Sequence, residues 1–139
     1  MKVKCIKTAY ADDTEVVLRY GANFVATHIL LDKGYIVYAI TNFKGMIEYL
    51  IYDETLWPRL YPANFFDVVD TQLPYEEWHF GKFQYSSAVD DSAQIYYVLG
   101  SKEMATDEDL WMSIIEMDCV GLLHLKEWRK LVDRQYEGY

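Results

Sequence analysis

The chain has 139 residues with 22 acidic and 13 basic side chains, which gives a formal net charge of −9. This length corresponds to one domain at roughly 150 residues per domain, so a large multidomain enzyme is excluded. Hydrophobic residues make up 52% of the chain, which excludes a disordered protein. Aromatic residues reach 17%, and we therefore expect an acidic surface rich in tyrosine.

The acidic balance limits the class of partner. Nucleic-acid binding requires Lys and Arg to neutralise phosphates, so we expect no direct nucleic-acid contact. The charge favours a basic protein partner, because opposite fields steer association. A role in solubility alone is the alternative.

The N-terminus lacks the apolar stretch of a signal peptide and no run is long enough to span a membrane, so we expect a cytoplasmic protein without membrane contact. The oligomeric state stays open.

Strands are expected over most of the first half of the chain. Val3 and Cys5 alternate with two lysines, which indicates a strand with one face inward. The further strand-forming segments are residues 16–18, 23–31, 35–40 and 46–52. Residues 41–45 have hairpin length and end in a glycine that can adopt positive φ. The sequence therefore predicts a hairpin of the strands 35–40 and 46–52.

Two prolines punctuate the next segment. Pro58 keeps residues 57–60 out of a central strand, because proline cannot donate to a strand ladder. Pro62 opens a short turn, and residues 67–70 are extended again. Residues 1–70 are thus expected to form a small antiparallel barrel or a strongly bent sheet.

The remaining residues, 71–139, are expected to add two strands and two helices. The strands are residues 78–85 and 94–99. The helices are residues 106–119, with Thr106 as N-cap, and residues 122–136, and both are amphipathic. The predicted fold is α+β, a single domain over residues 1–139 with both C-terminal helices packed on the sheet.

The residue types of catalysis and metal binding occur without the spacing that such chemistry needs. The three histidines, His28, His79 and His124, are far apart and form no metal-ligand motif. Cys5 and Cys119 have no activating neighbours and are expected to be buried free thiols. The glycines are scattered singly and form no phosphate loop. We expect no catalytic residue, no metal and no cofactor, and predict that the protein is not an enzyme.

Acidic residues gather in predicted loops with Tyr and Trp close by in the sequence. Protein interfaces concentrate Tyr and Trp at their centres, while charged rims select the partner. The alternative is that the loop acids are merely solvated and that Tyr suits half-buried strands. The candidate partner-binding residues are Asp12, Asp13, Tyr52, Asp53, Glu54, Trp57, Tyr85, Asp90 and Asp91.

Four segments follow a common order: a first strand ending in Cys-Ile-Lys, a glycine step into a central hairpin, and a Tyr-Pro turn before a Phe-rich last strand. They are residues 3–7, 34–38, 48–54 and 60–70. This order resembles small acidic bacterial and prophage proteins over about the first 80 residues. The resemblance implies a Src-homology-like barrel, and some such proteins are immunity partners of secreted toxins. Residues 9–31 are longer than the pattern, both helices lie outside it, and it implies no catalytic residues.

The leading hypothesis is an immunity protein that neutralises a bacterial toxin by occlusion. Acidic loops would occupy a basic cleft of the toxin, and Tyr and Trp would anchor the contact. One alternative is a prophage or housekeeping barrel module that binds a peptide in an aromatic groove. A second alternative is an enzyme of unrecognised type.

Overall fold

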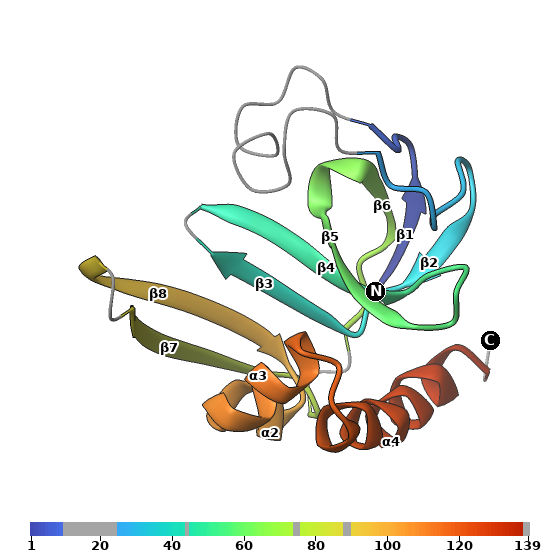
Figure 1. Ribbon diagram of the computed structural model, residues 1–139. Helices are drawn as coiled ribbons and strands as arrows, with labels where there is room; N and C mark the ends of the chain where they lie inside the picture. The colour runs from blue at the N-terminus through green and yellow to red at the C-terminus, as the bar shows by residue number, and fades with distance from the viewer. Residues whose placement is uncertain (10–24, 44, 74–75, 88–89, 138–139) are drawn as a thin grey trace. The chain divides into compact units, whose positions relative to one another are not determined.

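The computed structural model describes residues 1–9, 25–43, 45–73, 76–87 and 90–137, with the backbone alone at 85–87, 90–94 and 137. The α+β class is confirmed: the strands form two antiparallel sheets, of orders β2-β1-β6 and β5-β4-β3-β8-β7, and helices follow them (Figure 1). The sheets are not closed, so the predicted barrel is wrong. The chain divides into two compact units, residues 1–37 with 48–72 (unit 1) and residues 38–47 with 73–139 (unit 2).

The segment 34–43 contributes strands to both sheets and not to a single barrel. The predicted strand 35–40 is in fact two strands, β2 (Gly34–Ile36) and β3 (Ala39–Phe43). β2 pairs with β1 in the smaller sheet, whereas β3 pairs with β8 in the larger one. Both faces of this segment are apolar, so the residue pattern alone gives no sign of the change of sheet at Val37 and Tyr38.

In unit 1, β1 (Lys2–Cys5) lies between β2 and β6 (Phe66–Asp70). Val3 and Cys5 are fully buried on its inner face, as the alternation predicts. β4 (Met46–Tyr52) pairs with β5 (Pro58–Pro62), and the 3-10 turn η1 (Ala63–Phe65) leads into β6. β5 is the outer strand of its sheet and begins at Pro58, which fits the rule that proline avoids central strands.

In unit 2, β7 (His79–Ser87) and β8 (Asp90–Gly100) form a long hairpin, and β8 also pairs with β3. Three helices follow in the described ranges: α2 (Lys102–Thr106), α3 (Glu108–Ile115) and α4 (Cys119–Glu137). α2 and α3 lie at the end of the hairpin away from its turn (Figure 1). None of these helices combines the length and the apolar composition of a membrane span.

The helix starts differ from the prediction. Ser101 caps α2 by accepting from the Met104 N–H, and Asp107 caps α3 by accepting from the Leu110 N–H. Thr106 is the last residue of α2, and its hydroxyl donates to the Lys102 carbonyl at 2.7 Å. The predicted Thr106 cap is therefore wrong. The prediction did not include the short helix that begins after Ser101 and that contains Thr106. The next helix begins one residue later, and its cap is Asp107, a residue type at least as suitable for an N-cap as threonine.

Three tryptophans of unit 2, Trp78, Trp111 and Trp128, are buried in its core. The Trp128 indole donates to the Tyr38 carbonyl at 2.7 Å, and the Tyr38 hydroxyl donates to Asp133 Oδ1 at 2.7 Å. Burial, followed by the hydrogen bond to Asp133, raises the pKa of Tyr38. These two bonds fix α4 to the start of β3.

A hydrogen bond also joins α4 to the cap of α2. Ser101 Oγ and His124 Nε2 are 2.8 Å apart, while Ser101 Oγ accepts from the Met104 N–H. Because Oγ accepts on one side, its hydrogen is available to donate to a neutral His124 ring. Burial lowers the pKa of His124, and the nearby charge of Glu103 acts in the opposite direction.

We therefore expect the free energy of unfolding to fall as the pH drops below 6.5, the ordinary pKa of histidine. In that window the unfolded chain binds a proton at residue 124 that the folded protein does not, and this favours unfolding. Urea titrations between about pH 8 and about pH 5.5 measure the effect. The variant His124→Gln is expected to show a shallower pH slope, and equal slopes would contradict the prediction.

Candidate protein-interaction site

The loop between β4 and β5, residues 53–57, has a defined turn geometry. The Leu56 N–H donates to the Asp53 carbonyl at 2.9 Å, and the Asp53 N–H donates to the Trp57 carbonyl at 3.2 Å. Leu56 has a φ of 64°, in the left-handed region. A turn followed by one left-handed residue is a common short hairpin connection, in which glycine usually takes the left-handed position. Leucine at that position is disfavoured by contact of its Cβ with the backbone.

The Asp53 side chain, which is fully buried, holds this loop from inside. Its Oδ1 accepts from the Thr55 N–H at 2.8 Å and from the Thr55 hydroxyl, and its Oδ2 accepts from the Tyr61 hydroxyl at 2.7 Å. Arg59 Nε lies 3.4 Å from Oδ2. Burial and then the bond to Asp53 raise the pKa of Tyr61. The buried carboxylate thus has partners at both oxygens, which its burial requires.

Glu54 ties the β4–β5 loop to the segment before β2. Its N–H donates to the His28 carbonyl at 2.9 Å. Its Oε1 accepts from Lys33 Nζ at 2.5 Å and from the Tyr35 hydroxyl at 2.8 Å. The Tyr35 hydroxyl in turn accepts from the Leu30 N–H at 2.9 Å. One glutamate therefore fixes the two segments to each other.

The same contacts shift the pKa values of both acidic groups. The hydrogen bonds from Lys33 and then Tyr35 lower the pKa of Glu54. Burial, and to a smaller degree the bond to Glu54, raises the pKa of Tyr35 to about 12. Glu54 is therefore ionised and Tyr35 neutral at physiological pH, which is the pairing that the hydrogen bond needs.

The two joined segments expose apolar side chains to solvent. Leu56 is 76% exposed and Trp57 48%, while Leu30 is 52% and Leu31 58% exposed. We call these four residues the Leu56 surface. Single exposed leucines are ordinary in soluble proteins. Four exposed apolar side chains on two segments that hydrogen bonds hold in place mark a candidate protein-interaction surface, and Trp57 is of a residue type enriched among interface anchors.

The predicted partner-binding residues fall in different places. Asp53 is buried and Glu54 is ion-paired, so their charges serve the loop itself in this structure. Tyr52 ends β4 and is half-buried, and Trp57 is exposed. Tyr85, Asp90 and Asp91 lie on the β7–β8 hairpin near its turn, where the backbone of Ser87 pairs with Asp90 and that of Tyr85 with Gln94. Asp12 and Asp13 lie outside the described residues.

The sequence did not mark Leu56 in the loop as a site residue, nor Tyr61 and Lys33, which bond to Asp53 and Glu54. An aspartate in a loop can accept a hydrogen bond from the backbone N–H two residues on, and this turn signal could have marked Asp53 as a residue that holds the loop. Nothing in the sequence indicates that Leu56 adopts a left-handed conformation, because leucine is uncommon in that conformation.

The other predicted site features have mixed outcomes. Cys5 and Cys119 are free thiols, as expected, but Cys119 is exposed at the start of α4 rather than buried. Within the described ranges, no three or more His, Cys, Asp and Glu side chains are grouped so as to hold a metal ion. A comparison with known protein families, with curated proteins and with solved structures finds no match to the chain.

Proposed function

We propose that the protein binds another protein through the Leu56 surface, and that this partner is basic. In its most specific form, the proposal makes the chain an immunity protein that covers the active cleft of a bacterial toxin. The protein then acts by occlusion and not as an enzyme. The observation that carries the proposal is Leu56, which is 76% exposed and held at a φ of 64°.

The left-handed backbone conformation of Leu56 is unfavourable in the free protein, and its exposed side chain gains little packing in exchange. A left-handed conformation costs about 1–2 kcal/mol for a residue with a side chain. At 76% exposure, the side chain recovers little of that by burial. A partner that covers Leu56 and Trp57 supplies the missing apolar contact. Asp53 and Glu54 already hold the segments, so binding orders few further groups, and preorganisation of this kind favours affinity.

The charge of −9 supports the choice of a basic partner. Opposite fields raise the association rate and exclude partners of like charge. A toxin that acts on nucleic acid has a basic cleft, because its substrate is a polyanion. In this proposal Asp12, Asp13, Asp90 and Asp91 contribute charge, Tyr52 and Tyr85 contribute packing, and Asp53 supports the loop from inside.

The test is co-expression with the product of the adjacent gene, with complex formation measured at low and high salt. We expect a complex that weakens about tenfold or more as salt screens the charges, and rescue of cells that the partner alone poisons. Absence of a complex, or a complex indifferent to salt, would contradict the proposed basic partner.

The variant Leu56→Asn separates binding from folding. Asparagine tolerates the left-handed conformation, and little packing is lost, so stability should be unchanged or higher. We expect the affinity for the partner to fall about tenfold, which corresponds to about 1.4 kcal/mol. Leu123→Gln is the matched control, because Leu123 on α4 is 65% exposed and lies outside the Leu56 surface. Equal affinities of Leu56→Asn and the wild type would exclude this surface.

A further inference from the structure

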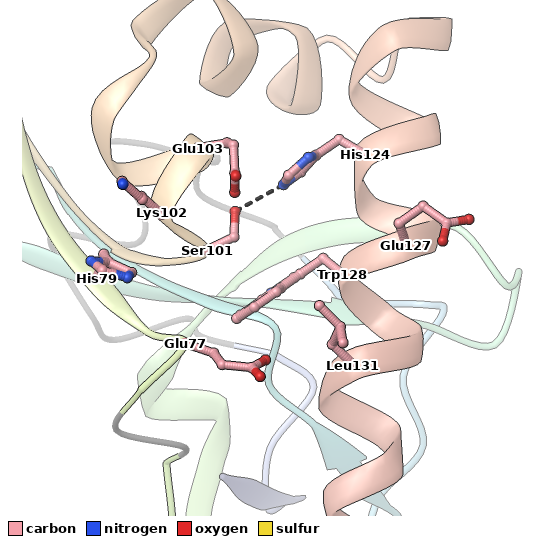
Figure 2. A pocket seen from close by; sticks show the side chains of 9 residues that line it. All are labelled: Glu77, His79, Ser101, Lys102, Glu103, His124, Glu127, Trp128 and Leu131. Carbon is pink, nitrogen blue, oxygen red and sulfur yellow. Dashed lines mark hydrogen bonds between the residues drawn. The ribbon is translucent and has the colours of Figure 1, made fainter.

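Unit 2 contains a pocket of about 380 Å³ between helix α4 and the residues where β8 leads into α2 (Figure 2). This volume lies within the range of small-molecule sites in proteins. The residues that line it are Glu77, His79, Ser101, Lys102, Glu103, His124, Glu127, Trp128 and Leu131. None of them belongs to the Leu56 surface, so the pocket is a separate site.

The aromatic wall of the pocket is rigid. The Trp128 N–H is bound to the Tyr38 carbonyl at 2.7 Å, and its ring packs edge-on against Trp78 at 5.7 Å between centroids. Leu131, one turn further along α4, is 41% exposed and extends the apolar wall. A fixed indole beside an aliphatic side chain suits an alkyl chain or the face of a flat cation.

The polar wall is predominantly acidic. Glu127 is ion-paired with Lys130 at 2.8 Å, whereas Glu77 and Glu103 have no ion pair in the part of the chain that the structure describes. Figure 2 shows Glu103 pointing toward Ser101 and His124, and Glu77 extending past Trp128, while Lys102 points away from that ring. The pocket thus has one carboxylate near Ser101 and another near Trp128, and its lysine points away from the ring.

Ser101 and His124 close the pocket between these walls. Their hydrogen bond, together with the cap that Ser101 makes to α2, occupies the serine hydroxyl on both sides. Burial lowers the pKa of His124, so the ring is neutral at physiological pH and adds no positive charge to repel a cation. The serine here serves as a helix cap and wall rather than as an exposed nucleophile.

We propose that this pocket binds a small organic cation, an alkylguanidinium or an alkylamine, with its alkyl part against Trp128 and Leu131. The charged head lies at Glu103, which accepts its hydrogen bonds, and Glu77, on the other side of Trp128 in Figure 2, adds negative charge to the pocket. A planar guanidinium has several donors and pairs well with carboxylates and aromatic faces. This site goes beyond the proposed function, and either can fail without the other.

The probe is n-butylguanidinium, with n-butylurea as a neutral molecule of the same shape. Isothermal titration calorimetry is expected to show saturable binding of butylguanidinium and at least about tenfold weaker binding of butylurea. Trp128 is unsuited to substitution, because it is buried in the core of unit 2. Tryptophan fluorescence supplies the second measurement, because Trp128 is one of four tryptophans in the chain and a cation at its ring changes its share of the emission.

The variant Glu103→Gln is expected to weaken butylguanidinium binding by about tenfold at unchanged stability. Asp109→Asn is the matched control, because Asp109 is an exposed acid in the first turn of α3 and does not line the pocket. This control should bind like the wild type. No saturable binding of butylguanidinium, equal binding of butylurea, or an equal loss in Asp109→Asn would each overturn the proposal.

Discussion

Replacing Gly81 by alanine is expected to destabilise unit 2 by about 3 kcal/mol or more. A Cβ at this position of β7 would lie 1.7 Å from the Ala105 carbonyl oxygen and 2.5 Å from the carbonyl carbon. Both atoms are backbone atoms of α2, so no side chain can rotate away and the helix must move off the strand. Urea denaturation of the variant measures the loss.

Gly34→Ala is the matched control for this prediction. Gly34 also lies in a strand, β2, but a Cβ there would meet only the Val3 carbonyl oxygen at 3.8 Å, an ordinary contact. We expect its free energy of unfolding to stay within about 1 kcal/mol of the wild type. If the two variants were equally stable, the close approach of α2 to β7 would be refuted.

The second large effect concerns Asp53. Asp53→Ala removes the acceptor of the buried Tyr61 hydroxyl and of two Thr55 donors, and a loss of about 3 kcal/mol is expected. The loop around Leu56 loses its internal support, so affinity for the partner should fall together with stability. Thermal or urea unfolding and the partner titration measure the two effects.

Two further variants show whether the Asp53 contacts act as described. The double variant Asp53→Ala with Tyr61→Phe should lose less than the sum of the single losses, because both substitutions remove the same 2.7 Å hydrogen bond. Glu54→Gln keeps the shape of a partly exposed side chain and an oxygen that can accept from Lys33 or Tyr35. Its loss of unfolding free energy should therefore be much smaller than that of Asp53→Ala. Additive losses in the double variant would show that the carboxylate and the tyrosine act independently.

Local patterns predicted the parts of the fold that local physics decides. Alternation in β1 placed Val3 and Cys5 inside, and both are fully buried. The turn predicted at Pro62 is present as η1, although Pro62 is the last residue of β5 and the N-cap of the turn, with an extended ψ of 133°, rather than its first helical residue. The hairpin strands 78–85 and 94–99 were found, although β7 and β8 extend further toward their turn than predicted.

Features that depend on distant segments were not predictable from the sequence. The change of sheet after β2 depends on β8, which lies some sixty residues later and pairs Leu99 with Ile40. The candidate site shows the same limit. The sequence predicts that Asp53 and Glu54 are surface acids. In the structure, Tyr61 and Arg59 contact Asp53, and Lys33 pairs with Glu54. Both charges therefore have partners within the protein. Apolar periodicity says nothing of such partners, which only the folded chain brings together.

The alternation of the chain between its two units has a consequence for synthesis on the ribosome. Unit 1 is complete only when β6 is available for β1, which requires the chain to extend to residue 70. β3 is made before that but acquires its partner β8 only when residues 96–99 have emerged. Until then the edge of β3 opposite β4 has no partner strand, and an open strand edge readily joins other chains. The nascent protein therefore carries an aggregation-prone edge from the time β3 has emerged until residues 96–99 have emerged.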